Sequence, residues 1–374
     1  MAIRLLKYVF VLTLLVLFIF KFFHIFSGVT AGEVDELIGL NDGPHLFWDN
    51  DSAYHIIYVE NGQKLTANGA IGDSSYFNGL GYDQGHRYQI GFEKPEPAQF
   101  DSVGKFFVFS DTHGEFGYTT ELLKAQNIID DSLNWAFGEG HLVIDGDLVD
   151  RGRHVTELLW LVYKLEQQAK NAGGKVHYLL GNHEIMVMQN DLRYINPDYE
   201  KICSLLTISY DQLYSDNTEL GRWLRSKKIA MKINNVLFVH GGLNPDIIEK
   251  GYTIAQINEI VHNSLSLSRD SIKAVDSLKY IYGSFGPFWY RGYHYETDKY
   301  PQTPADQVEA LLSFYKVDKI VVGHTVVDSI APLYEGKVYA VNQDYELKEE
   351  YEGLLFEGGH FYAADIYGGK RLIE

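Results

Sequence analysis

Short polar motifs, each directly after an apolar run, carry the side chains of this chain that could do chemistry. The central motif, DGDLVDRG at 145–152, follows Leu142-Val143-Ile144. Read alone, that motif is a polar turn with a surface ion pair. Four more motifs have the same placement: SDTHG at 110–114, GNHE at 181–184, HGG at 240–242 and GHT at 323–325. Because the carboxyl ends of parallel strands meet at one edge of a sheet, five such strand ends favour one shared site.

The donor groups in these motifs are those of a divalent-metal site. Carboxylate, carbonyl and imidazole groups suit Mn, Fe or Zn. Asp147 could bridge two cations about 4 Å apart, a spacing that suits phosphoryl chemistry. A water shared by two such cations would be acidified and could attack phosphorus in line. The six candidate ligands are Asp111, His113, Asp147, Asn182, His240 and His324.

Further side chains in and around these motifs could handle a proton or a phosphate group. His183 directly follows a candidate ligand, and it could protonate a leaving oxygen if Asp150 held its tautomer. Arg151 offers a two-pronged fork for phosphoryl oxygens, and Arg291 could supply a second. For Arg291, packing against the aromatic residues beside it is an alternative interpretation. Glu184 could act in the site or brace its own loop.

The elements that must position these motifs alternate between strand and helix. Apolar runs at 105–109, 142–144 and 176–180 are typical of buried strands, and helical spacing at 117–127 and 154–171 separates them. This α/β order predicts central, mostly parallel sheets flanked by helices. The other predicted segments are a helical region at 191–225, strands at 229–233 and 236–239, helices at 254–264 and 304–314, a loop over the site at 277–300, and a strand at 319–322.

The N-terminal part of the chain has a different character. Arg4 and Lys7 precede an apolar run, which predicts a signal peptide or a membrane anchor and an exported, extracytoplasmic (periplasmic) location for the rest of the chain. Alternating apolar residues and the turn Asn61-Gly62 predict β-hairpins farther along. The predicted domains are a signal or anchor segment at 1–31, a β-rich accessory subdomain at 32–98 and a catalytic domain at 99–374.

Composition narrows the classes of partner. The chain has 374 residues and a net charge of -18, which argues against a nucleic-acid partner because phosphate backbones reward a basic face. Local cations can still attract a phosphorylated substrate. Cys203 is the single cysteine, so no intramolecular disulfide can form. Stability must therefore come from the core and from any bound metal.

As an ordered set, the five motifs resemble the calcineurin-like metallophosphoesterase superfamily, in its phosphoprotein phosphatase branch. The Asp-Arg-Gly ending of the central motif and the glutamate after GNH point to that branch. The Tyr-Leu-Leu lead into GNHE, the pair Arg193-Tyr194 and the stretch GPFWYRGY at 286–293 resemble the Shewanella-like bacterial protein phosphatases. The chain lacks the C-terminal Ser-Ala-Pro-Asn-Tyr element of the eukaryotic branch.

The resemblance implies a β-sandwich fold and a role for each matching residue. It implies a metal-dependent phosphomonoester hydrolase, a protein phosphatase acting on phosphoserine, phosphothreonine or phosphotyrosine. Two alternatives stay open, a nucleotide or dinucleotide polyphosphate hydrolase and a metal-dependent binding module without catalysis. The implied roles are a first metal on Asp111, His113 and Asp147; a second on Asp147, Asn182, His240 and His324; a proton donor in the Asp150–His183 pair; and phosphate binding by Arg151 and Arg291.

Overall fold

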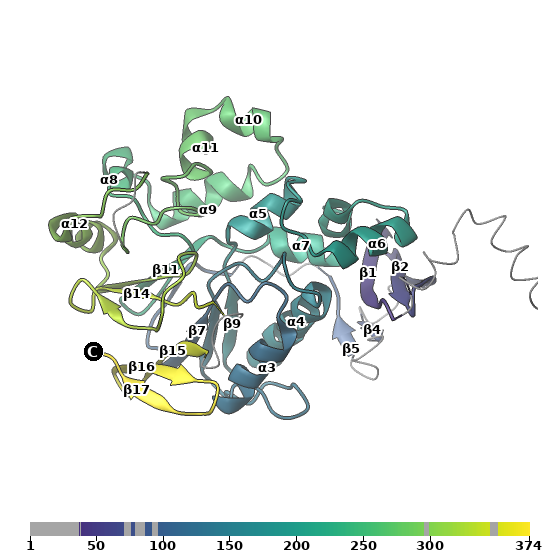
Figure 1. Cartoon of the computed structure of the whole chain (residues 1–374), viewed down its shortest axis with the longest axis horizontal. Coiled ribbons are helices and arrows are strands. Elements are labelled where there is room, and N and C mark those ends of the chain that lie inside the picture. Colours follow the sequence, from purple (N-terminus) through teal and green to yellow (C-terminus); the bar gives the residue numbers. More distant parts are fainter. Residues whose placement is uncertain are drawn as a thin grey trace, which may run out of the picture.

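Two mixed β-sheets form the centre of the molecule, with helices on their outer sides (Figure 1). The structure is a computed structural model that describes residues 37, 39–70, 76–78, 87–91, 96–294, 299–344 and 351–374. The predicted signal or anchor segment lies outside these described residues. Within the described part of the chain, no helix combines the length and the apolar character needed to cross a membrane.

Each central sheet has six strands. The first has the order β17 (Lys370–Leu372), β16 (His360–Asp365), β15 (Glu352–Glu357), β7 (Lys105–Phe109), β8 (His141–Ile144), β9 (Lys175–Tyr178). The second has the order β13 (Pro332–Leu333), β14 (Val338–Ala340), β12 (Lys319–Val322), β11 (Val236–Val239), β10 (Ala230–Ile233), β6 (Gln99–Phe100). The predicted strands are therefore present.

The two sheets share an apolar layer because side chains alternate along each strand. Phe106 and Val108 of β7 face this layer, whereas Phe107 and Phe109 belong to the core under the helices. From the other sheet, Phe238 of β11 meets Phe106 edge-on, with ring centroids 5.5 Å apart. A strand buried on both faces explains why these segments are almost wholly apolar in the sequence.

Helices α3 (Phe116–Ala125) and α4 (Val155–Asn171) connect the first three parallel strands. The apolar stripe of α4 is buried against the sheet, and the helix stops before Gly173, whose φ of 81° suits glycine. The other helical elements of the described residues are α5 (Asn182–Met188), α6 (Pro197–Leu206), η2 (Tyr210–Tyr214), α7 (Glu219–Arg225), α8 (Asp246–Lys250), α9 (Ile254–His262), α10 (Arg269–Lys273), α11 (Asp276–Ile281) and α12 (Ala305–Tyr315).

The predicted N-terminal hairpins form a three-stranded antiparallel sheet. Its strands are β1 (Asp42–Asn50), β2 (Ala53–Glu60) and β3 (Gln63–Ala70), and a separate pair is β4 (Tyr76–Asn78) with β5 (Arg87–Gln89). Asn61 and Gly62 have φ values of 49° and 72°, as a two-residue hairpin turn requires. Trp160 of α4 donates its indole N–H to the carbonyl of Pro44 at 2.8 Å. Side chains of β1 and β2 join the core that lies under α4.

Three predictions about elements need correction. The sheets are not mostly parallel, because five of their ten strand pairings are antiparallel, chiefly at β15–β17, which a hairpin joins without a crossover helix. The predicted helical region is broken into α6, η2 and α7. Asn196 and Thr218 cap new helices there, and Thr207 ends one at a φ of 63°. The predicted loop over the site begins with helix α11.

Candidate active site

The structure brings the six predicted ligands together where strands β7, β8, β9, β11 and β12 end. Five of them lie in the wall of one cavity of about 290 Å³, and the sixth, His240, is 1 % exposed behind it. His183, Arg151 and Arg291 line the same cavity. Asp150 is buried beside it. The convergence that the strand ends predicted is thus present, and the individual roles stay predictions.

The loops at these strand ends hold their residues in an unusual backbone conformation. Asp111, His113, Asp147, Asp150, Arg151 and His324 all have positive φ, between 45° and 70°. This left-handed region costs residues other than glycine roughly 1–3 kcal/mol each, so it persists where neighbours over-determine it. The backbone N–H of Asp111 donates to Gly146 at 3.0 Å, and that of His113 donates to Asp147 at 3.0 Å. The loops therefore fix one another.

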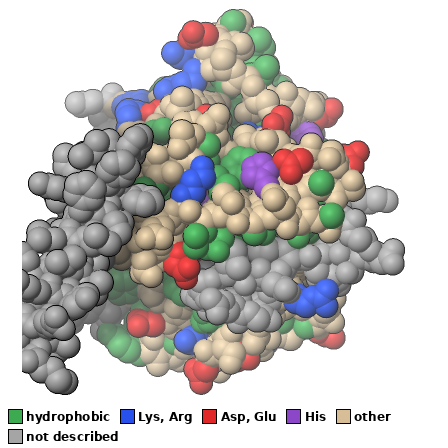
Figure 2. Space-filling model, turned by 90° about the vertical axis from the view of Figure 1, so that its right-hand side faces the viewer, with side chains coloured by type: hydrophobic (Ala, Val, Ile, Leu, Met, Phe, Trp, Pro, Cys, Tyr) green, Lys and Arg blue, Asp and Glu red, His purple; other side chains and the backbone are tan. Residues whose placement is uncertain are grey.

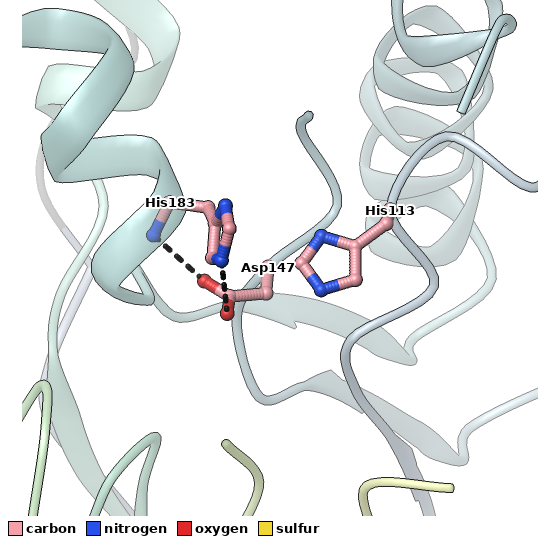
Figure 3. Close-up of side chains that lie close together, drawn as sticks. All are labelled: His113, Asp147 and His183. Carbon is pink, nitrogen blue, oxygen red and sulfur yellow. Dashed lines mark hydrogen bonds and ion pairs between the residues drawn. The ribbon is translucent and has the colours of Figure 1, made fainter. Parts of the chain in front are cut away.

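The first group of donors surrounds the Asp147 carboxylate. Donor atoms of His113, Asp147 and His183 lie within 4.8 Å of one another, and Figure 3 shows the two rings on either side of the carboxylate. His113 uses Nδ1 to donate to the carbonyl of Val149 at 2.9 Å. Its Nε2 is therefore the nitrogen left for a metal. Asp111 shares the cavity, and one of its oxygens accepts the backbone N–H of His324 at 3.0 Å.

The second group shares the same carboxylate. Asp147, His240 and His324 also place donor atoms within 4.8 Å of one another. His240 donates Nδ1–H to the carbonyl of Asp145 at 2.5 Å, and its Nε2 lies 3.1 Å from both Asp147 and the Asn182 amide oxygen. The Nε2 of His324 is buried without a hydrogen-bond partner among the described residues. Two donor groups that share one carboxylate, with an orphaned imidazole nitrogen, fit a pair of divalent cations.

The charges in the cluster support the same conclusion. Burial raises the pKa of Asp111 to about 6, and burial together with the neighbouring carboxylates raises that of Asp145 to about 8. For His240, burial opposes protonation, but Asp147 and Asp111 outweigh it and raise the pKa to about 10. Burial and the charge of His240 hold the pKa of His324 well below its ordinary value. Crowded, desolvated carboxylates of this kind gain from a bound cation.

Glu184 braces two of the ligand loops, one of the two roles that the sequence allowed. It is 1 % exposed. Its carboxylate accepts N–H bonds from Asp147 and Leu148 at 2.9 Å each and from Gly181 at 2.7 Å. It also accepts the hydroxyl of Tyr178 at 2.7 Å. One buried side chain therefore couples the loop after β8 to the loop after β9.

The predicted proton donor and phosphate ligands lie in or beside the same cavity. His183 Nδ1 lies 2.7 Å from the Asp150 carboxylate, which leaves Nε2 facing Asp147 at 3.9 Å. Burial opposes the charge of His183, but Asp147 and Asp150 outweigh it, so its pKa is raised. Arg151 is exposed at the cavity. Arg291 donates to the His324 carbonyl at 2.9 Å, so it also holds a ligand loop in position.

A model of the calcineurin-like phosphoesterase family matches residues 104–328, which contain every predicted ligand. The chain belongs to the calcineurin-like phosphoesterase family. It is a metal-dependent phosphoesterase, as the motifs indicated.

Individual relatives of the phosphoesterase are similar over most of its length. A protein-tyrosine phosphatase from a psychrophilic Shewanella species is 34 % identical, with a TM-score of 0.83 over 90 % of this chain and 100 % of that one. Shewanella-like protein phosphatase 2 from Arabidopsis thaliana is 26 % identical over 64 % of this chain and 69 % of the relative. An uncharacterised protein from Schizosaccharomyces pombe is 30 % identical over 59 % of this chain and 66 % of the relative. The phosphoesterase spans about two thirds of the length of these curated relatives.

The phosphoesterase cavity also contains residues that the sequence analysis missed. Asn342, Gln343 and Asp344 line it, one residue beyond the end of β14. Because β14 is parallel to β12, it ends at the edge where His324 lies. The end of a strand was the sequence signal that could have identified these residues, but β14 is short and was not recognised as a strand. Tyr194, Trp289 and Val326 complete the wall.

The chemistry of the phosphoesterase is divided between its metals and its side chains. Divalent cations, when bound, lower the pKa of water and neutralise phosphoryl oxygens. The side chains bind the phosphoryl group and protonate the departing oxygen. Arg151 can pair with phosphoryl oxygens, and the Asp150–His183 pair can hold a proton on Nε2 for the departing oxygen. Burial of His183 between two carboxylates keeps that proton available.

Proposed function

We propose that the chain is a protein phosphatase that accepts phosphotyrosine. The observation that carries the proposal is the cavity, in which the donor groups and Arg151 share one space with the aromatic residues Tyr194 and Trp289. Tyr194 is 44 % exposed, its ring 5.2 Å from the ring of His183. Aromatic walls beside a phosphate-binding floor suit an aryl phosphate.

Similarity supports the proposal from a second direction. The Shewanella phosphatase is a protein-tyrosine phosphatase, and this chain matches it along its whole length. The polyphosphate alternative would need a base-stacking surface, which the same two aromatic residues could also supply. Both kinds of substrate, a phosphopeptide and a nucleotide anhydride, would use the same metal centre. Measuring which of them is turned over faster therefore distinguishes the two proposed functions.

A substrate panel tests the proposal. We expect turnover of phosphotyrosine peptides with a kcat/KM at least about tenfold above that of ATP or a diadenosine polyphosphate, and lower turnover of phosphoserine peptides. The Asp147→Asn variant is the matched control, and it should lose activity on every substrate. Preferential hydrolysis of the nucleotides would replace this proposal with the polyphosphate alternative. Metal binding without turnover of any substrate would favour a binding module.

We also propose that two divalent cations, with Mn, Fe and Zn as the candidates, bind on either side of Asp147. Asp111, His113 and Asp147 would hold one of them, and Asp147, Asn182, His240 and His324 the other. His183 lies beside the first ion and keeps its role as the proton donor. The shared carboxylate and the N- and O-donor set support two ions of this class. Elemental analysis of protein purified without added metal should give about two ions per chain. One ion per chain at full activity would contradict the two-metal assignment.

The export prediction remains a proposal. It rests on Arg4 and Lys7 before the apolar run, all within residues that the structure does not describe. A reporter fused after Glu374 should be active outside the cytoplasm. A fusion that is active in the cytoplasm alone would contradict export.

A further inference from the structure

A second cavity adjoins the catalytic one and has a different lining. Its volume is about 360 Å³, and it shares Asn182 and Trp289 with the catalytic cavity. Residues of α5, α10 and α11 form much of its wall. A substrate whose phosphate reaches the donor groups would therefore have its flanking part beside this second cavity, here called the basic groove.

The basic groove concentrates positive charge in an acidic protein. Among the described residues, five cationic side chains line it against one carboxylate, so these residues contribute a charge of +4 in a chain of net charge -18. The cations are Arg193, Arg269, Lys273, Lys279 and Lys299, and the carboxylate is Asp191. Asp270 and Asp276, on the same two helices, do not line the groove. Figure 2 shows Lys and Arg side chains gathered toward the top of its face, the height at which α10 and α11 lie in Figure 1.

Asp191 neutralises only part of this charge. Its buried carboxylate accepts two bonds from Arg193, at 2.7 and 2.9 Å, and one from Arg269 at 2.9 Å. This shared carboxylate fixes two guanidinium groups at the rim. Lys273 and Lys279 are exposed, and no ion pair with another described residue involves either of them. Like charges held close together without counter-charges repel one another, which an anionic partner would relieve.

Apolar side chains form another part of the groove. Ile185 and Met186 of α5, with Ile272 and Tyr282 near α10 and α11, line it together with the cations. Apolar surface bordered by cations suits a peptide segment that carries both apolar and acidic side chains. An isolated inorganic anion would not use the apolar part.

We propose that the basic groove selects phosphopeptides with acidic side chains, carboxylates or a second phosphate, a few residues to one side of the phosphorylated residue. This inference rests on the proposed protein phosphatase function and names its substrate class. An extended peptide advances about 3.4 Å per residue, so positions two to four residues from the phosphate reach the neighbouring cavity. The groove binds the flank and leaves the chemistry to the donor groups.

The test compares peptides that differ only in their flanks. One phosphotyrosine peptide carries neutral residues; others carry three glutamates, or three lysines, at positions 2 to 4 before or after the phosphotyrosine. We expect glutamates on one side to raise kcat/KM by about tenfold at low ionic strength, mostly through KM. Salt at 0.5 M should remove most of this preference. A peptide with a second phosphate in place of the glutamates tests that source of charge.

Variants assign the preference to the groove. The double variant Lys273→Gln/Lys279→Gln should reduce the acidic preference to about twofold or less. The readout is the ratio of kcat/KM for the acidic peptide to kcat/KM for the neutral peptide, because damage to the metal site lowers both values alike. Lys124→Gln/Lys170→Gln on α3 and α4 changes the net charge equally, and it should keep the preference. The reversal Lys273→Glu/Lys279→Glu should favour the lysine-flanked peptide.

The outcomes separate this inference from the proposed function. Equal turnover of all phosphopeptides would overturn the groove assignment while the phosphatase assignment stands. Loss of the preference in the α3–α4 variant as well would show general charge attraction, which also overturns it. Turnover of nucleotides without any phosphopeptide would overturn both.

Discussion

The neighbours His183 and Glu184, in the first turn of α5, have different surroundings. Glu184 accepts backbone and hydroxyl donors in the interior, whereas His183 lines the catalytic cavity and pairs with Asp150 at 2.7 Å. A glutamate that is satisfied by its own loops has a structural role. A histidine with one nitrogen held and the other facing the cavity has the geometry of a proton donor.

His183→Asn tests that donor. We expect the variant to keep both metals and to lose roughly 10²–10⁴-fold in rate on alkyl phosphates such as phosphoserine, whose leaving oxygen needs a proton. The loss should be much smaller on p-nitrophenyl phosphate, whose anion leaves unaided. Asp150→Asn should show the same pattern more weakly. Steady-state kinetics with metal analysis measure this, and equal losses on both substrates would remove the acid role.

At the scale of elements, close backbone packing holds the ligand loops. Gly152 follows the central motif, and its N–H donates to the His113 carbonyl at 2.8 Å. A Cβ at Gly152 would lie 2.2 Å from that carbonyl oxygen. By contrast, Gly117 in α3 has no atom within 4 Å of the same position. The loops after β7 and β8 can therefore approach only where one of them has glycine.

Gly152→Ala should displace the loop that carries His113. We expect a loss of stability of about 1–3 kcal/mol and lower occupancy of the metal at that donor group. Gly117→Ala is the matched control, and it should be neutral or raise stability by about 0.5–1 kcal/mol, because alanine suits a helix better. Denaturant unfolding and metal analysis measure both. Full occupancy in Gly152→Ala would show that the loop can shift without cost.

A pair of buried histidines between β8 and β9 makes the first sheet sensitive to acid. The rings of His141 and His177 are joined by a 3.0 Å hydrogen bond. Burial and Lys175 lower the pKa of His141 to about 4, and burial and His141 hold that of His177 well below its ordinary value. Both rings are therefore neutral in the folded chain at neutral pH.

This pair should lower stability as pH falls from about 6.5 toward about 4. Between these values the unfolded chain binds protons that the folded rings exclude, so stability rises with pH and is lost on acidification. We expect His141→Gln/His177→Gln to show a shallower decline in Tm over this range than the native chain. Thermal unfolding from pH 7.5 to 4, in chelator, measures the slopes. Parallel curves would contradict the assignment.

At the scale of the whole molecule, the donor groups connect the two sheets. Asp111, Asp147 and Asn182 follow strands of the first sheet, whereas His240 and His324 follow strands of the second. Cations held by both sets would cross-link the halves of the sandwich. Metal binding and global stability should therefore be coupled.

Metal removal should lower the Tm. We expect chelation to reduce it by about 5 °C or more, because cations that bind the folded state alone stabilise it by mass action. Added Mn²⁺ should restore it. Asp147→Asn should respond least to the chelator, since it alters the shared ligand. An unchanged Tm after verified metal loss would show that the sheets need no cross-link.

The sequence by itself determined the donor types, their order and the strand ends that carry them. Those features are local: an apolar run predicts a buried strand, and a polar motif directly after it predicts a position at the sheet edge. The family followed from the same motifs. Individual helix ends were less certain, because caps at Asn196 and Thr218 divided a region with helical periodicity.

Only the tertiary structure decided how distant segments meet. The contact between Asp111 and His324 joins residues 213 positions apart, and no spacing in the sequence predicts it. Strand direction at β15–β17 depended on a hairpin, which pairs neighbouring strands without a crossover. The basic groove combines Arg193, Arg269 and Lys279 from separate elements. A charged side chain in the sequence predicts exposure, but packing alone decides which other charges lie beside it.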